Sequence, residues 1–333
     1  MDPLSSLYAA VARSRRRAYA AHPDRRRRLA RPVISIGNVA VGGRAKTPLT
    51  VTIAAALLAN GERPAVLSRG YARRVTDDDA VVVRDPGGLR ADVDRAGDEP
   101  MMIARQLEGV VVVTCADRYV AGRLAEDRFG STVHVLDDGF QHFRLHRDID
   151  LVVIARDDLE DPRTLPFGRL REPVDAIRGA DAVIALDDAP VQGLAPGRPI
   201  WPARRTLEGA RLVEPYGAPA QPSSGAVVAV AGIARPRRFF ADLRAAGWPI
   251  AREIGFRDHH AYSAGDLAHI FDAARAEGAA LVVTTEKDLV RLLPFRPFPL
   301  AVAWVPMTVR IEPADAFEAW LMTALDEARR GGR

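Results

Sequence analysis

The chain has 333 residues with 47 basic and 43 acidic side chains, so its formal net charge is only +4. This balance excludes a protein whose whole surface binds nucleic acid, and an apolar content of 48% excludes a disordered or fibrous chain. A single cysteine, Cys115, excludes an internal disulfide and a cysteine-cluster zinc site, and no apolar stretch is long enough to predict a membrane-spanning helix.

Residues 1–31 form a strongly basic segment in which nine arginines outnumber two aspartates. Leu4, Leu7, Tyr8 and Val11 recur at helical spacing, which predicts a basic amphipathic helix. Two interpretations remain open: an interfacial helix attracted to anionic lipid, and a solvated helix docked on the protein by its apolar stripe. An RNA-binding arm is disfavoured because no aromatic residues are interleaved with the arginines.

Short apolar runs rich in valine and isoleucine alternate with helical segments over the next part of the chain. Strands are expected at residues 32–36, 64–68, 79–83, 110–114, 133–136, 150–154 and 182–185, and helices at 47–60, 98–107 and 117–128. Buried strands that alternate with helices predict a mostly parallel sheet covered on both faces.

A weakly periodic stretch rich in proline, glycine and alanine, residues 187–224, precedes a second α/β run. That run predicts strands at 227–230, 250–254, 280–284 and 300–305, and helices at 236–246, 264–277, 287–292 and 314–329. We therefore expect three parts: the N-terminal helix (1–31), a core (32–215) and a smaller C-terminal α/β domain (216–333).

The first expected strand leads into a glycine-rich loop that ends at Lys46 and Thr47, and a helix follows. In a P-loop of this order the backbone cradles phosphates, the lysine contacts them and the threonine binds Mg²⁺. The cradle would be formed by Gly42, Gly43, Arg44 and Ala45. The pattern is imperfect because Ala40 and Ala45 stand at its two glycine positions, so an ordinary βα turn is the alternative.

Two observations favour phosphate binding over an ordinary turn. Lys46 is one of only two lysines in the chain, and a compact ammonium fits a backbone cradle better than the planar fork of arginine. The expected strand at 133–136 ends in Asp137 and Asp138, where P-loop proteins carry an acidic residue for Mg²⁺. Together they predict a site for a nucleotide with Mg²⁺ and a P-loop NTPase-like core.

Several rare strings occur in a fixed order along the chain. They are Gly42-Gly43 with Lys46-Thr47-Pro48, Ser68-Arg69-Gly70-Tyr71, Gly97-Asp98-Glu99-Pro100, Asp137-Asp138-Gly139-Phe140-Gln141-His142, Arg171-Glu172-Pro173, Asp258-His259-His260 and Thr285-Glu286-Lys287-Asp288. This set resembles the tetraacyldisaccharide 4′-kinase family of lipid A biosynthesis over nearly the whole chain.

The resemblance implies a peripheral protein on the cytoplasmic face of the bacterial inner membrane. It implies transfer of the γ-phosphoryl of ATP to the 4′-hydroxyl of an acylated glucosamine disaccharide 1-phosphate, which gives lipid IVA. The implied fold is a P-loop kinase core with a smaller α/β domain and the active site between them.

The resemblance also implies roles for individual residues. Asp98 matches the catalytic base, paired with His259 or His260, of which we favour His259. Thr47, Asp137, Asp138 and Glu172 match the residues around Mg²⁺. Gln141 and His142 lie close to these residues in the family strings, and Arg171 precedes Glu172; all three are expected to bind or support the substrate. Independently of the resemblance, Arg69 and Arg118 follow expected strands on the C-terminal side of the sheet, where ligands bind in open α/β folds, so both are candidate phosphate contacts.

One departure from the family loop keeps two other hypotheses open. Ala45 stands where the family usually has glycine, and its methyl group would crowd the phosphates or strain the backbone. A catalytically weakened homologue that binds lipid is therefore one alternative. A nucleotide-dependent switch or metal-insertion GTPase is another, although Thr285-Glu286-Lys287-Asp288 carries glutamate where a guanine-reading motif has asparagine or threonine.

Overall fold

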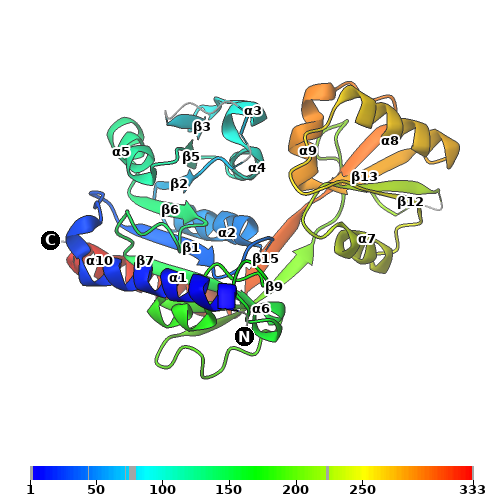
Figure 1. Cartoon of the computed structure of the whole chain (residues 1–333). Coiled ribbons are helices and arrows are strands. Elements are labelled where there is room, and N and C mark those ends of the chain that lie inside the picture. Colours follow the sequence, from blue (N-terminus) through cyan, green and yellow to red (C-terminus); the bar gives the residue numbers. More distant parts are fainter. Residues whose placement is uncertain (1–2, 44, 72, 75–79, 223–224, 332–333) are drawn as a thin grey trace.

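Two β-sheets divide the chain into a larger and a smaller unit (Figure 1). The computed structural model describes residues 3–43, 45–71, 73–74, 80–222 and 225–331. The larger sheet contains β1 (Val33–Asn38), β2 (Pro64–Ser68), β3 (Val81–Asp85), β4 (Gly88–Leu89), β5 (Val111–Thr114), β6 (Val133–Asp137), β7 (Ile149–Ala155), β8 (Ala182–Leu186), β9 (Ile200–Leu207) and β15 (Met307–Ile311).

These strands lie in the order β15-β9-β8-β7-β1-β6-β2-β5-β3-β4. The run from β9 to β5 is parallel, whereas β15 at one edge and β3 and β4 at the other are antiparallel. The central strands β1 and β6 are buried along their whole length, as their apolar sequences predict. The predicted P-loop NTPase-like α/β core with a mostly parallel sheet is confirmed.

Helices cover both faces of this sheet and give it two apolar layers. One layer includes buried residues of α2 (Lys46–Ala59), α4 (Asp98–Gln106) and α10 (Ala314–Gly331), and α5 (Arg118–Phe129) packs on the other face. Short helices α3 (Val93–Ala96) and α6 (Arg156–Glu160) and the 3₁₀ turns at Pro23–Arg25 and Val174–Gly179 complete this unit.

The N-terminal helix α1 (Pro3–Ala21) lies across the front of the larger unit (Figure 1). Reciprocal hydrogen bonds between Ser5 and Thr164, at 2.9 and 2.7 Å, fasten its first turn. Leu4, Leu7 and Val11 of the predicted apolar stripe are nevertheless 56–63% exposed. None of the helices in the described ranges combines the length and the hydropathy of a membrane span.

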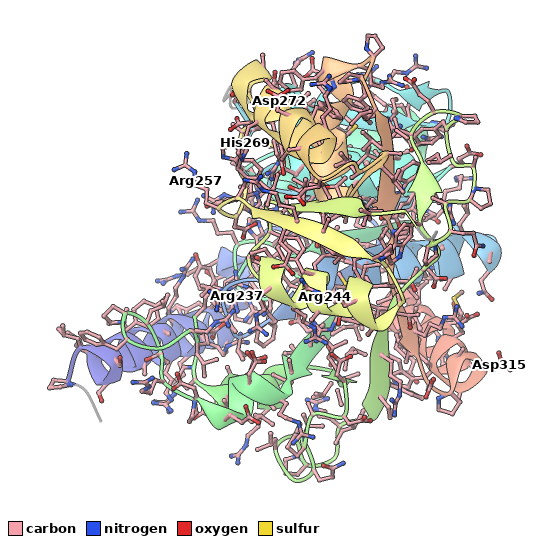
Figure 2. The ribbon with its side chains drawn as sticks, turned by 90° about the vertical axis from the view of Figure 1, so that its right-hand side faces the viewer. Arg237, Arg244, Arg257, His269, Asp272 and Asp315 are labelled. Atoms are coloured by element: carbon pink, nitrogen blue, oxygen red, sulfur yellow. The ribbon has the colours of Figure 1, made fainter. Side chains whose placement is uncertain are left out.

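The smaller unit is a five-stranded sheet flanked by helices on both faces. Its strands are β10 (Arg211–Leu212), β11 (Val227–Ala231), β12 (Ile250–Gly255), β13 (Leu281–Thr285) and β14 (Ala301–Val305), in the order β10-β14-β13-β11-β12. Figure 2 shows α8 (Ala264–Ala276), with His269 and Asp272, on one side of β12 and α7 (Pro236–Ala245), with Arg237 and Arg244, on the other. A capping box between Ser263 and Asp266 begins α8.

The structure differs from the predicted domain division in its last part. After the smaller unit, the chain returns to the larger sheet as β15, which pairs with β9 from Met307–Leu207 to Ile311–Ala203. Helix α10 then packs on the core of the larger unit. The smaller unit therefore lies between β9 and β15, not over residues 216–333. Both paired strands connect the two units, as Figure 1 shows.

The packing of α10 predicts the effect of Leu325→Ala. Leu325 is fully buried in the core of the larger unit, so its truncation should lower the free energy of unfolding by about 2–5 kcal/mol. Urea denaturation measures this change. Val120→Ala at a 43% exposed site of α5 is the control and should cost about 0.5 kcal/mol or less. Equal losses for both variants would contradict the assignment of α10 to the core.

Candidate active site

The glycine-rich loop connects β1 to the N-terminus of α2, where the sequence predicts phosphate binding. Lys46 is the first residue of α2, and its ammonium donates to the side-chain oxygen of Asn38 at 3.0 Å. Thr47 is buried beside it. The loop is fastened from outside by Arg169, whose carbonyl accepts from the Val41 amide at 2.8 Å. The lysine is thus held over the end of the strand before any ligand arrives.

Ala45 adopts the backbone conformation that the family glycine is suited to. Its φ is +53° and its ψ is +26°, in the left-handed region. An L-residue pays a steric cost of about 1–2 kcal/mol there, because its Cβ approaches the following carbonyl. The alanine therefore keeps the left-handed turn and strains it. Gly42 also has a positive φ, +92°, whereas Arg44 lies outside the described residues.

The acidic pair at the end of β6 lies beside this loop. Asp138 accepts two hydrogen bonds from Arg171, at 2.7 and 2.8 Å, and its carboxylate lies 3.5 Å from the Lys46 ammonium. Although burial opposes it, Lys46 and Arg171 hold the pKa of Asp138 well below its usual range. Asp137 accepts from Thr50 at 3.3 Å, and burial together with the charges of Glu99 and Asp138 raises its pKa to about 7. A buried carboxylate close to two other acidic side chains is a favourable place for a cation.

Three buried donor atoms of this site lack a hydrogen-bond partner among the described residues: Asn38 Nδ2, Arg118 Nε and Arg171 Nε. Buried donors without partners are costly, so an anionic ligand that accepts from these three would stabilise the site. Arg118, expected from its position after β5, is buried there, and its charge acts on both Asp137 and Asp138. The donor set fits the phosphates of a nucleotide.

The four residues predicted to bind metal do not form one cluster. In the part of the chain that the structure describes, no three carboxylate, histidine or cysteine side chains gather closely enough to hold a metal ion. Mg²⁺ in phosphoryl-transfer sites commonly takes one or two protein ligands and completes its shell with phosphate oxygens and water. Thr47 and Asp137 fit that arrangement.

Glu172 occupies a different position from the other predicted metal residues. It is 3% exposed, and Arg16 of α1 binds it with two hydrogen bonds of 2.7 and 2.8 Å. Gln141 donates to Glu172 at 3.0 Å and to the Asn38 carbonyl at 2.9 Å. Glu172 and Gln141 therefore support the end of β1 from the side where α1 lies.

Asp98 and His259 meet across the two units. Asp98 is the first residue of α4 and is 3% exposed; its Oδ2 lies 2.8 Å from Nδ1 of His259. Gly97 precedes it with a φ of +85°, and a Cβ there would lie 2.7 Å from the Tyr71 carbonyl. His259 also has a positive φ, +57°. His260 instead stacks on Phe256, with ring centroids 4.4 Å apart, inside the smaller unit.

Two basic residues of α9 (Glu286–Leu292) complete this inter-unit cluster. The second lysine, Lys287, lies 3.2 Å from Nε2 of His259 and 3.5 Å from Glu99. Arg291 forms a buried ion pair with Asp98 and donates to the His260 carbonyl at 2.9 Å. Burial and then the charge of Lys287 lower the pKa of His259, which favours the neutral ring. Sequence reasoning missed Arg291, whose only signal is its spacing of four residues from Lys287 on one helix.

Arg69 and His142, predicted as substrate-binding or supporting residues, lie close to the phosphate site in different environments. Arg69 is exposed at the end of β2, and its charge acts on the buried Arg118. His142 is half-buried, and burial, with the charges of Arg118 and Arg147, lowers its pKa to about 4. Gly43 is exposed in the second half of the loop, with open space where a Cβ would stand.

A glycine-rich loop between a central parallel strand and a helix, with an acidic neighbouring strand end, defines a P-loop nucleotide-binding protein. The family model for LpxK, tetraacyldisaccharide-1-P 4′-kinase, matches residues 1–326. The chain belongs to this family, and it is an enzyme, a kinase of lipid A biosynthesis.

Individual relatives match over nearly their full length. The tetraacyldisaccharide 4′-kinase of Koribacter versatilis is 38% identical and that of Rhodopseudomonas palustris 39% identical; the alignments cover 98% and 99% of this chain and 97% and 94% of the relatives. A crystal structure of LpxK from Aquifex aeolicus in complex with ATP superposes with a TM-score of 0.81 at 31% identity, over 97% of this chain and 98% of that one.

The left-handed conformation of Ala45 predicts that Ala45→Gly stabilises the protein. Glycine removes the Cβ strain, but it loses more chain entropy on folding and the packing of a methyl group that is only 7% exposed, so we expect a small net gain of about 0.5 kcal/mol in the free energy of unfolding. Chemical denaturation measures it. The matched control is Ala55→Gly in the exposed middle of α2, which should instead cost about 1 kcal/mol. A loss of stability in both variants would show that Ala45 is not strained.

Proposed function

We propose that the enzyme transfers the γ-phosphoryl group of ATP, with Mg²⁺, to the 4′-hydroxyl of tetraacyldisaccharide 1-phosphate, giving lipid IVA. The observation that carries the proposal is the Asp98–His259 pair held across the two units next to the phosphate loop. Glu99, the neighbour of Asp98, connects the two sites: its charge acts on Asp137, and its side chain pairs with Lys287.

The catalytic role assigned to Asp98 follows from the partners of His259. Lys287 can only donate, so we assign the ring proton of His259 to Nδ1, which donates it to Asp98. Nη2 of Arg291 lies 3.1 Å from the same Nδ1, and because a guanidinium cannot accept, this approach is a packing contact and not a second hydrogen bond. Arg291 and His259 together fix the direction of the Asp98 carboxylate. The carboxylate is then the group that receives the proton of the sugar hydroxyl as it attacks the phosphorus. A general base of this kind contributes about 10²–10⁴ in rate.

Phosphoryl transfer otherwise requires positioning and neutralisation of charge. Lys46 and the orphan donors of Asn38, Arg118 and Arg171 are assigned to the phosphate oxygens, and Gly42, Gly43, Arg44 and Ala45 to the cradle. Thr47 and Asp137 are assigned to Mg²⁺, with Asp138 and Glu172 supporting the site through their ion pairs. Bound Mg²⁺ would neutralise the charge that develops on the transferred group.

The N-terminal helix is assigned to the membrane surface that carries the acylated acceptor. Leu4, Leu7 and Val11 remain exposed although α1 is docked, which removes the main reason to assign the stripe to intramolecular packing. Figure 2 shows the N-terminal half of α1 extending past the rest of the larger unit. Arginines on such a helix attract anionic lipid. The location proposed is the cytoplasmic face of the bacterial inner membrane.

The proposed base predicts the behaviour of Asp98→Asn. Its turnover with ATP, Mg²⁺ and the disaccharide acceptor should fall about 10²–10⁴-fold, while its affinity for ATP stays close to that of the wild type, because Asp98 is not part of the phosphate loop. Transfer of labelled phosphate and equilibrium binding of ATP measure the two quantities. Asp272→Asn, on the surface of α8 (Figure 2), is the control and keeps wild-type turnover. Absence of phosphorylated lipid from the wild-type reaction would refute the function itself.

Removal of the Lys287 charge predicts a shift in the pH dependence of turnover. Lys287 lowers the pKa of His259, while Asp258 and Glu99 act in the opposite direction. In Lys287→Met that pKa rises, so His259 becomes protonated at higher pH and weakens Asp98 as a base. The acid limb of kcat against pH should therefore move to higher pH. Arg275→Met on α8 removes a distant cation and should leave the limb in place; an unshifted limb in Lys287→Met would contradict the assignment.

A further inference from the structure

The N-terminal helix makes one contact that surface attachment does not require. Arg16, in the last turns of α1, binds Glu172 through both Nε and Nη2, at 2.7 and 2.8 Å. The side chains are only 20% and 4% exposed, in contrast to Arg13–Asp175 one turn earlier, where both side chains are almost half exposed. Arginine is suited to this geometry because its planar fork matches a carboxylate.

Aromatic rings fix the direction of the Arg16 side chain. Its guanidinium lies 4.1 Å from the ring centroid of Phe140 and 4.9 Å from that of Phe143. Phe140 is fully buried. It packs so closely on Gly37 of β1 that a Cβ added to the glycine would lie 2.5 Å from the Cβ of Phe140. The surface against which Arg16 rests is thus packed directly on the strand that leads into the phosphate loop.

From Glu172 a continuous series of hydrogen bonds reaches the phosphate loop. Gln141 donates to Glu172 and to the carbonyl of Asn38, at 3.0 and 2.9 Å. The Asn38 side-chain oxygen in turn accepts from Lys46 at 3.0 Å. All members of this series are buried or half-buried. If one of them is removed, its neighbour loses a hydrogen bond that water cannot easily replace.

We propose that Arg16 is a positioning residue for nucleotide binding: by holding Glu172 and Gln141 it fixes Asn38 and Lys46, so that docking of α1 and binding of the nucleotide phosphates are coupled. Without Arg16, Glu172 loses its bidentate ion pair and is a buried carboxylate held mainly by Gln141, which favours its turning toward water. That movement loosens Gln141 and its hydrogen bond to the Asn38 carbonyl, while β-pairing and Arg171 still hold the rest of Asn38, so a partial loss of affinity is expected. The proposal rests on the proposed function only in that the anion is ATP.

The decisive measurement is equilibrium binding of ATP to the full-length protein without lipid or acceptor. Arg16→Ala should weaken ATP binding about tenfold, within the range found for residues that act through a contact network. Arg13→Ala, which removes the same charge from the same helix, should stay within about twofold of the wild type. Both should bind vesicles of anionic phospholipid equally well, which separates the effect from attachment to a surface.

A second pair of variants keeps the test decisive if Arg16→Ala folds poorly in thermal unfolding. Arg16→Lys keeps the charge but not the planar guanidinium, and it should weaken ATP binding severalfold. In a protein that already carries Glu172→Gln, adding Arg16→Lys should weaken ATP binding almost no further. Wild-type affinity in Arg16→Lys, equal affinities of Arg16→Ala and Arg13→Ala, or additive losses with Glu172→Gln would each overturn the proposal. Turnover of the wild type with the lipid acceptor is scored separately, so failure of the proposed function leaves this comparison readable.

Discussion

The buried carboxylate of Asp98 is the constraint on which the arrangement of the two units depends. A carboxylate that is 3% exposed must be paired, because an ionised group without a partner costs several kcal/mol in the interior. Its partners, His259 and Arg291, both come from the smaller unit. The larger unit alone therefore cannot satisfy Asp98. The smaller unit completes the site, and the paired strands β9 and β15 connect it to the larger unit.

The same electrostatic reasoning explains the phosphate site. Lys46 and Arg171 neutralise Asp138, while Arg118 is buried with an unsatisfied Nε, so cationic donors remain available after the local carboxylate is paired. Asp137, with its raised pKa, remains the carboxylate with the least compensation. A polyanion that brings its own divalent cation satisfies both deficits at once. This complementarity is the physical argument for the proposed nucleotide with Mg²⁺ over an isolated phosphate.

A feature of the fold or of the site could be predicted when the residues that form it are close together in the sequence. The order of strand, loop and helix around Lys46 and the acidic end of β6 are local patterns, so both were predicted to within a residue or two. The return of β15 to the first sheet depends on antiparallel pairing with β9 about a hundred residues earlier, and no local pattern marks it. The contacts Arg291–Asp98 and Arg16–Glu172 span 193 and 156 residues, which explains why Arg291 was missed and Arg16 was counted only among the surface charges.

Backbone strain gives an independent indication of where the fold is adjusted to its site. Ala45, Asp138 and His259 are three of the five non-glycine residues with positive φ in the described part of the chain, and each lies in the site. Strained residues persist where the surroundings over-determine them. Asp138 is held by Arg171 and Lys46, and His259 by Asp98, Arg291 and Lys287. Ala45 has no hydrogen-bonded or charged partner of this kind; its methyl group packs in the core of the larger unit, and the backbone on either side is fixed by the strand end at Asn38 and the start of α2. This makes the loop dependent on whatever holds Asn38, and it connects the unusual alanine with the series of contacts that begins at Arg16.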